Sequence, residues 1–394
     1  MSKKILAVLL VVCMALVGVL VSGCGGTQPV QPIKIGGIFD LTGGLATMGV
    51  LISKGATLAV EEINAAGGVL GGRNLTLLLE DSATSADTGF TAFKKLVEVD
   101  GVQVIVGQMT SGESLASGNY AATAQVPFVS PSATSVLLTD QPWTQWALRT
   151  CTADSFQGGL IAQTIIDGGF KKAAILVMDN PYGVGIEQIV TQKLQAAGVE
   201  IVKDIRYDAT KMDYLTELGE IKDANPDVIM HCGYEDDGAV VYAQADSLGL
   251  STIPWVVTEG VYGLDTEKHP DAAAFMVKGN FRGTRMAADP TSPAYQAFLA
   301  AYQARWGVSP GVYCDTVYDA VKLIAKAIDK AGAYNGTAIK DALYQVGVNY
   351  VGASGTVTFD TTGDRIHGTY AIWKLQYNEG TGKYEYVDLQ YIPV

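Results

Sequence analysis

The segment Ile33-Lys34-Ile35-Gly36-Gly37-Ile38-Phe39 decides the fold, because the pattern that it opens repeats along the chain. It is a short apolar run that ends at a polar loop, which is typical of a buried strand. Apolar residues then follow helical spacing over 48–66 and stop at Gly67-Gly68, and a second strand-like run covers 75–81. A strand, a helix and another strand in this order predict an α/β fold with a parallel sheet covered by helices.

The same alternation continues through the rest of the chain and restarts near Gln157. Strands are expected over 102–107, 126–130, 173–179, 199–208, 227–232 and 253–258. Helices are expected over 87–99, 157–167, 185–197, 213–224, 294–305 and 316–331. A further helix is expected after the strand 227–232, and it ends near Gly249. The end of the chain, 356–392, is β-rich in composition. Two successive α/β units of similar size predict two lobes, because one hydrophobic core rarely serves a chain of this length.

The first residues have the pattern of an export signal. Lys3 and Lys4 precede 17 apolar residues, 5–21, and the segment closes with Ser22-Gly23-Cys24. This ending resembles the lipobox of bacterial lipoproteins, which implies cleavage after residue 23 and a lipid on Cys24. The alternative is an uncut membrane anchor, since 17 residues lie at the short end of what spans a bilayer. Both interpretations hold the rest of the chain outside the cytoplasm.

The mature chain is acidic. Removal of Lys3 and Lys4 changes the formal charge from −13 to −15. Nucleic acids and anionic lipid surfaces are bound through clustered Lys and Arg, so they are disfavoured as partners. Residues 24–32 have the composition of a linker, which would let a globular body stand away from a membrane.

Cysteine and histidine residues indicate no metal or disulfide chemistry. Cys151, Cys232 and Cys314 remain after the leader, and their odd number and irregular spacing fit small buried residues. The three histidines are isolated from each other and from paired ligands. We therefore expect no metal and no cofactor.

Polar loops follow the predicted strands, where the carboxyl ends of parallel strands form ligand sites. These loops are 40–44, 108–112, 131–134, 180–183, 233–235 and 259–260. Hydroxyls near helix N-termini, such as those of Ser111, Ser132 and Thr134, hold carboxylates. Glu259 suits an ammonium group, and Tyr182 and Tyr234 suit hydrogen bonds or a cation–π contact. Such a divided site favours a zwitterion.

Four motifs carry a family resemblance: residues 36–43 (Gly-Gly-Ile-Phe-Asp-Leu-Thr-Gly), 59–68 (Ala-Val-Glu-Glu-Ile-Asn-Ala-Ala-Gly-Gly), 126–134 (Val-Pro-Phe-Val-Ser-Pro-Ser-Ala-Thr) and 182–185 (Tyr-Gly-Val-Gly). Together they resemble the leucine/isoleucine/valine-binding proteins of bacterial ABC importers. The resemblance implies a two-lobe type I periplasmic-binding fold with three crossovers. It places the first lobe at 33–150 plus about 285–358 and the second at 151–284 plus about 359–394, with a ligand carried to a membrane permease.

The resemblance also assigns roles to single residues. Ser111 matches the serine on the ligand carboxylate, Ser132 the position whose backbone contributes, and Thr134 the threonine shared by carboxylate and ammonium. Tyr182 and Tyr234 match tyrosines that close from the second lobe, and Glu259 matches the acid on the ammonium. Met48 departs from a family tyrosine, Tyr313 replaces a phenylalanine, and Asp315 stands where some relatives have a large aromatic. Met109 and Ala133 complete the candidate ligand-binding set.

Each of these residues also has a structural interpretation. The two serines and the threonine fit helix N-caps, and Glu259 fits a solvated loop acid. The two tyrosines fit rim or core aromatics, and Met48, Met109 and Tyr313 fit ordinary packing. The run Glu235-Asp236-Asp237 predicts an acidic helix start rather than a calcium loop, because the alternating ligand spacing is absent.

Enzyme motifs fail, and the chain is not expected to be an enzyme. Residues 307–311 (Gly-Val-Ser-Pro-Gly) have the letters of a nucleophile elbow but follow a predicted helix and place proline after serine. We expect a monomeric, extracytoplasmic, lipid-anchored solute-binding protein for an aliphatic amino acid. The alternatives are a binder of an amide, urea or aromatic acid in the same fold, and a sensory receptor domain, which the absence of a second apolar span before Val394 disfavours.

Overall fold

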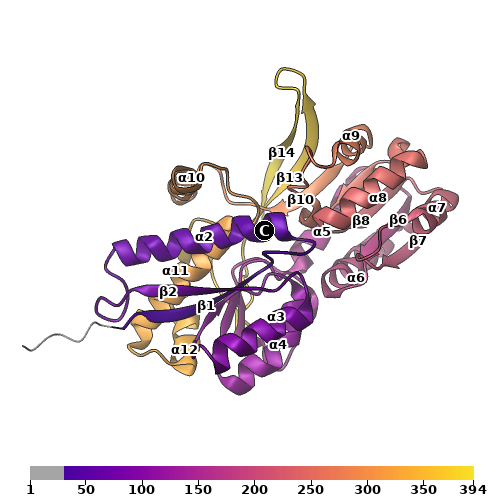
Figure 1. The fold of residues 1–394 in the computed structure, drawn as a ribbon. Coiled ribbons are helices and arrows are strands. Elements are labelled where there is room, and N and C mark those ends of the chain that lie inside the picture. The colour runs from indigo at the N-terminus through magenta and orange to yellow at the C-terminus, as the bar shows by residue number, and fades with distance from the viewer. Residues whose placement is uncertain (1–30) are drawn as a thin grey trace, which may run out of the picture. The chain divides into compact units, whose positions relative to one another are not determined.

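The computed structural model describes residues 31–394 (Figure 1). The predicted signal peptide 1–23, Cys24 and the linker up to residue 30 therefore lie outside the described residues. The first sheet has the strand order β2-β1-β3-β4-β5, and all of its strand pairs are parallel. Its strands are β1 (Ile33–Phe39), β2 (Leu75–Asp81), β3 (Ile105–Val106), β4 (Phe128–Ser130) and β5 (Ala147–Arg149).

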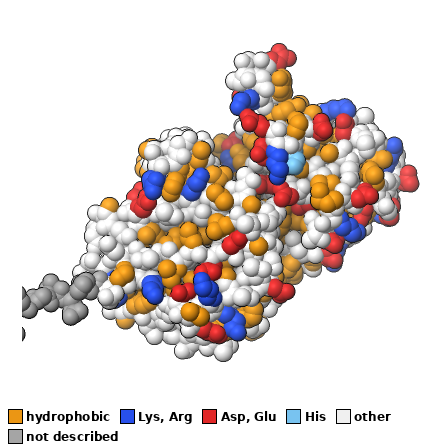
Figure 2. All heavy atoms as spheres, viewed as in Figure 1, with side chains coloured by type: hydrophobic (Ala, Val, Ile, Leu, Met, Phe, Trp, Pro, Cys, Tyr) orange, Lys and Arg blue, Asp and Glu red, His pale blue; other side chains and the backbone are white. Residues whose placement is uncertain are grey.

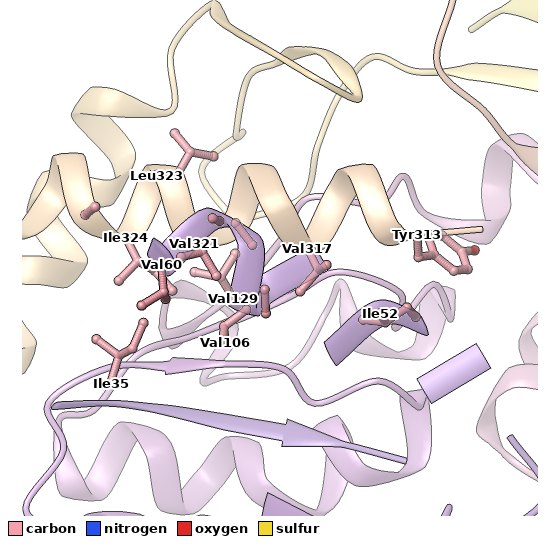
Figure 3. Close-up of a cluster of buried hydrophobic side chains, with 14 of the residues drawn as sticks. Ile35, Ile52, Val60, Val106, Val129, Tyr313, Val317, Val321, Leu323 and Ile324 are labelled. Carbon is pink, nitrogen blue, oxygen red and sulfur yellow. The ribbon is translucent and has the colours of Figure 1, made fainter. Parts of the chain in front are cut away.

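Helices cover both faces of this sheet (Figure 1). On one face α2 (Ala46–Ala65) packs against α11 (Cys314–Ala331), and on the other α3 (Ala86–Glu98) packs against α4 (Ser111–Ala124). Helix α12 (Gly336–Val346) packs beside α11. In Figure 3, Val60 of α2 and Val317 and Val321 of α11 gather over the sheet, and all three are buried. Burial of these apolar faces holds the late helices on the first sheet.

The second sheet has the order β14-β13-β10-β9-β8-β6-β7. Its strands are β6 (Lys172–Met178), β7 (Glu200–Tyr207), β8 (Val228–Cys232), β9 (Trp255–Val257), β10 (Arg282–Met286), β13 (Thr369–Asn378) and β14 (Lys383–Pro393). The strands from β7 to β10 are parallel, whereas β13 and β14 pair antiparallel. Its helices are α5 (Asp154–Asp167), α6 (Pro181–Ala196), α7 (Leu215–Ala224), α8 (Glu235–Ser247) and α9 (Pro270–Lys278).

The chain passes between the two sheets three times. The passages lie between β5 and α5, between β10 and α10 (Pro293–Trp306), and between β12 (Gly355–Val357) and β13. Strand β12 pairs with β11 (Tyr350–Gly352) in a small separate sheet. This arrangement confirms the predicted two-lobe α/β fold with a mostly parallel sheet in each lobe, while the predicted limits of the lobes stay a prediction.

Most predicted elements are present, with shifted ends. The predicted limits of β1 and β2 are confirmed, but β3 pairs over only two residues. Helix α5 begins at Asp154, not Gln157, and α6 begins at Pro181, not Gly185. The latter shift arises because the Asn180 side chain caps α6 by accepting a 2.9 Å hydrogen bond from the Gly183 N–H. The acidic helix start at Glu235 is confirmed by α8, whereas α4, α9, α12, β5 and β10 were not predicted.

Charged side chains are spread over the visible face of the molecule. Figure 2 shows acidic and basic groups interspersed over both lobes, without a large basic patch on that face. In the part of the chain that the structure describes, every helix is too short or too polar to cross a membrane. The predicted burial of Cys151, Cys232 and Cys314 is confirmed, and all three thiols are free.

Candidate ligand-binding site

Loops from both lobes line a cavity with about 360 Å³ of free space, its opening to solvent included. The first lobe lines it with Leu45, Met48, Met109, Thr110, Ser111, Ser132, Thr134 and Tyr313. The second lobe lines it with Tyr182, Tyr234, Glu259 and Gly260. The mixture of apolar walls with a few polar groups is typical of a ligand site.

All predicted site residues except Ala133 line this cavity. Ala133 is buried in the neighbouring core, and its carbonyl accepts a 3.1 Å hydrogen bond from Nη1 of Arg149. Leu45, Thr110 and Gly260 also line the cavity but were not predicted. Thr110 and Gly260 adjoin predicted residues in the same loops, whereas Leu45 has no polar group that would have marked it.

The hydroxyls of the first lobe lie at the start of α4 and in the loop after β4. Thr110 caps α4, because its hydroxyl accepts from the Glu113 N–H at 3.3 Å. The hydroxyl of Ser111 accepts a 3.1 Å hydrogen bond from the Ser135 N–H, which leaves its own hydrogen free to donate. Ser135, not Ser132 or Thr134, caps the 3₁₀ turn Val136–Leu138. The N-cap interpretation of Ser111, Ser132 and Thr134 is therefore wrong.

Ser132 uses its hydroxyl within the protein. This hydroxyl donates a 2.9 Å hydrogen bond to the carbonyl oxygen of Met109. Its donor is therefore committed, unlike that of Ser111.

Glu259 is the acid of the cavity and is 2% exposed. It follows β9, at the start of a 3₁₀ turn. Its Oε1 accepts a 2.7 Å hydrogen bond from the Tyr313 hydroxyl, and its Oε2 accepts from Nε2 of Gln157. Burial, together with the charge of Asp154, raises the pKa of Glu259 to about 8. The interpretation as a solvated loop acid is wrong, because the carboxylate is enclosed and no cation neutralises it in the described residues.

Tyr182 and Tyr234 form an aromatic wall from the second lobe. Their rings stack with centroids 5.9 Å apart and an interplanar angle of 8°. Tyr182 lies in the first turn of α6, and Tyr234 precedes α8. Burial raises the pKa of both phenols, so they stay protonated and act as neutral donors at neutral pH.

The remaining wall is apolar. Leu45, Met48 and Met109 are 4%, 6% and 2% exposed. Leu45 and Met48 lie at the start of α2, and Met109 lies in the loop after β3, where its sulfur accepts from the Asp40 N–H at 3.3 Å. These side chains add an apolar surface to a lining that also holds the carboxylate of Glu259 and the two tyrosine rings.

The two lobes meet around the cavity. The Ser135 hydroxyl donates a 2.7 Å hydrogen bond to the carbonyl of Pro181 across the lobes. Glu235 of α8 lies against the hydroxyl of Thr47 and the backbone N–H of Met48. Burial raises the pKa of Glu235 to about 8, and these two contacts limit that rise. These contacts hold the lobes together over the cavity.

The model of the periplasmic binding protein family matches residues 32–381. The Leu/Ile/Val-binding protein BraC3 of Rhizobium johnstonii is 31% identical over 352 residues, which cover 87% of this chain and 92% of that protein. The Leu/Ile/Val-binding protein homolog 7 of Brucella abortus is 26% identical and covers 82% of this chain and 84% of its own length.

Solved structures agree in fold. The branched-chain amino acid transporter substrate binding protein LivJ of Streptococcus pneumoniae, in complex with isoleucine, superposes with a TM-score of 0.78 at 29% identity, over 91% of this chain and 100% of that chain. A solute binding protein of Rhodopseudomonas palustris in complex with benzoate has a TM-score of 0.78 at 19% identity, over 91% and 96% of the two chains. The chain belongs to the periplasmic binding protein family, whose members serve as the solute-binding proteins of ABC transporters.

Proposed function

We propose that this protein captures an aliphatic α-amino acid between its lobes and delivers it to the permease of an ABC importer. The observation that carries this proposal is the carboxylate of Glu259, which is enclosed in the cavity without a cation and has a pKa raised to about 8. A ligand ammonium supplies the missing charge and returns the carboxylate to its ionised form.

The other walls fit the rest of such a ligand. The free donor of Ser111, at the N-terminus of α4, is suited to the α-carboxylate, and the helix dipole adds to that attraction. Leu45, Met48 and Met109 are suited to an aliphatic side chain. The names of the relatives and the isoleucine complex of LivJ support this choice of ligand.

An aromatic acid is the second candidate. The parallel rings of Tyr182 and Tyr234 favour it, since a flat ligand stacks on such a wall. A ligand without an amine leaves Glu259 buried without a partner, which disfavours this candidate. Amides and urea meet the same objection, and we keep the role of a receptor domain as an alternative to transport.

The substitution Glu259→Gln separates these candidates. Binding of each of the 20 amino acids and of benzoate is measured by calorimetry, with the exposed acid Glu267→Gln as the matched control. We expect an aliphatic amino acid to bind, with affinity that falls roughly 100-fold or more in Glu259→Gln only. Binding of benzoate alone, or unchanged amino-acid affinity in Glu259→Gln, contradicts the proposal.

We also propose that Cys24 carries a lipid and keeps the protein, as a monomer without covalent chemistry of its own, beside its permease. Cys24→Ala is expected to release the protein from membranes and to leave ligand affinity unchanged. Retention of the variant in the membrane fraction contradicts lipid anchoring at this residue and favours the uncut anchor.

A further inference from the structure

A second cavity, with about 560 Å³ of free space including its opening to solvent, adjoins the candidate site. Among the described residues, Tyr313 is shared by the linings of the two cavities. The second cavity is lined from both lobes, by the end of β10 and the passage that follows it, by α10, by the segment before α11, and by β14. The two cavities therefore adjoin at Tyr313 and otherwise have different linings.

Arg285 is the cation in the lining of this cavity, and its guanidinium group is paired within the protein. Arg285 donates from Nε to Oδ1 of Asp388 at 3.1 Å and from Nη2 to Oδ2 at 2.5 Å. Its Nη1 donates to the carbonyl of Met286 at 3.2 Å, and its guanidinium lies 4.8 Å from the ring centroid of Tyr262. A bidentate pair of this kind neutralises both charges, so Arg285 offers no free charge to an anion.

The carboxylate of Asp315, by contrast, forms no salt bridge in the described residues. One of its oxygens accepts a 2.9 Å hydrogen bond from the Thr316 N–H, and in the described part of the chain its other oxygen has no hydrogen-bond partner. Arg365 is the other nearby cation, but it donates to Thr150, Ser354 and His367. Asp315 thus faces the cavity without an ion pair.

The net charge around Asp315 is negative. Arg285 and Arg365 are the cations that act on it, and Asp388 and Asp319 oppose them, so one negative charge remains, that of Asp315 itself. Burial raises the pKa of Asp315, a shift that a bound cation reverses.

Aromatic residues line the same cavity as this carboxylate. Tyr262, Tyr295, Phe298, Tyr313 and Tyr391 all line the cavity. Their faces attract organic cations, and a carboxylate among such rings strengthens that attraction. No group of three or more potential metal ligands occurs in residues 31–394, which disfavours a metal ion here.

We propose that this cavity is a second binding site, and that it takes a small organic cation of the alkylammonium class, with its charge on Asp315 and its alkyl part on the tyrosine rings. The site does not depend on which ligand occupies the first cavity. A cation in the second cavity binds through Asp315, whereas a ligand in the first cavity binds through Glu259, and this difference distinguishes the two.

The test uses ethylammonium chloride as the probe, with sodium chloride at equal ionic strength as the reference. Saturation-transfer NMR on the purified full chain measures its binding. Asp315→Asn removes the charge and keeps the acceptor for the Thr316 N–H, and Ala288→Leu fills the cavity without changing charge. The exposed acid Asp271→Asn is the matched control, and thermal melts establish that each variant is folded.

We expect saturable binding in the unsubstituted chain, Asp271→Asn and Glu259→Gln, and affinity at least roughly tenfold weaker in Asp315→Asn and Ala288→Leu. Loss of binding in Glu259→Gln with retention in Asp315→Asn assigns the probe to the first cavity and overturns the proposal. Absence of binding to the unsubstituted chain, or equal affinity in a folded Ala288→Leu variant, overturns it as well.

Discussion

The hydroxyl of Tyr313 in the first lobe donates a 2.7 Å hydrogen bond to Oε1 of Glu259 in the second lobe. Tyr313 holds this position with φ of +66°, in the left-handed region that favours glycine. A side chain held there costs about 1 kcal/mol or more of conformational strain. This hydrogen bond therefore stabilises both the contact between the lobes and the ionised form of Glu259, and its donor is a residue with a strained backbone.

Tyr313→Phe keeps the ring and removes the donor. Because the lost hydrogen bond stabilises both the closed lobes and the ionised form of Glu259, we expect ligand affinity to fall by roughly threefold to 30-fold. Calorimetry measures this change, with the exposed Tyr377→Phe as the matched control. Equal affinities in the two variants would show that the interlobe hydrogen bond does not contribute to binding.

Ser111 and Ser132 differ in whether their donors are free, and this difference predicts unequal effects. Ser111→Ala removes the free donor that we propose for the ligand carboxylate, and it is expected to weaken binding by roughly tenfold to 100-fold. Ser132→Ala removes a donor already committed to Met109, so a smaller loss is expected. Titration of both variants with the best-binding amino acid compares them, and a larger loss in Ser132→Ala would contradict the assignment.

The strands were predictable from sequence where neighbouring residues alone determine them. The limits of β1 and β2 follow from apolar runs bounded by turns. The β1 run is buried except at Lys34, as predicted. The predicted burial of the β2 run is wrong beyond Leu75, because β2 lies at the edge of the sheet. Helix α4 was missed because Ser, Gly and Ala fill it, and its packing depends on Gly118, where a Cβ would lie 2.3 Å from the Trp143 ring. Strand β10 was missed because its pairing with β13 joins residues far apart in the sequence.

The residues of the candidate site were predictable to the extent that strand ends and the family resemblance mark them. Serine, threonine, tyrosine and glutamate in loops after strands can be recognised in the sequence, because their side chains can donate or accept hydrogen bonds to a ligand. Leu45 has none, and it reaches the cavity only because the loop before α2 turns it inward. The second cavity was not predictable, since it depends on Arg285 pairing with Asp388 in a distant strand.

Glu235 is expected to act as a latch, that is, to stabilise the closed arrangement of the two lobes through its contact with the start of α2. Helix α2 has no side-chain cap of its own and no acid in its first turn, and Glu235 of the other lobe lies against its Met48 N–H. Loss of a helix cap costs about 0.5–2 kcal/mol. Glu235→Ala is therefore expected to lower ligand affinity by roughly twofold to 30-fold.

The neighbouring exposed acid Asp236→Ala serves as the control for the latch. Because Glu235 is absent from the lining of the cavity, its removal should weaken every ligand by the same factor. Calorimetry with two amino acids of different size measures both factors, and a change in the preference between them would contradict a latch.

Asp154 predicts how stability depends on pH. It is fully buried, and burial raises its pKa from 3.8 to about 7, although the Thr134 hydroxyl and the charge of Arg149 lower the pKa in part. The folded form thus binds this proton more tightly than the unfolded form, so the free energy of unfolding falls as pH rises from about 4 to about 7.

Asp154→Asn removes this titration. Because the buried charge is gone, we expect the variant to be more stable than the unsubstituted chain at pH 8, by roughly 1–3 kcal/mol, with little difference at pH 4. Urea unfolding of the ligand-free protein at the two pH values measures this change, and the exposed acid Asp271→Asn should show neither effect. A lower stability of Asp154→Asn at pH 8 would mean that Thr134 and Arg149 stabilise the ionised carboxylate by more than its burial costs, and its pKa would then lie below, not above, its ordinary value.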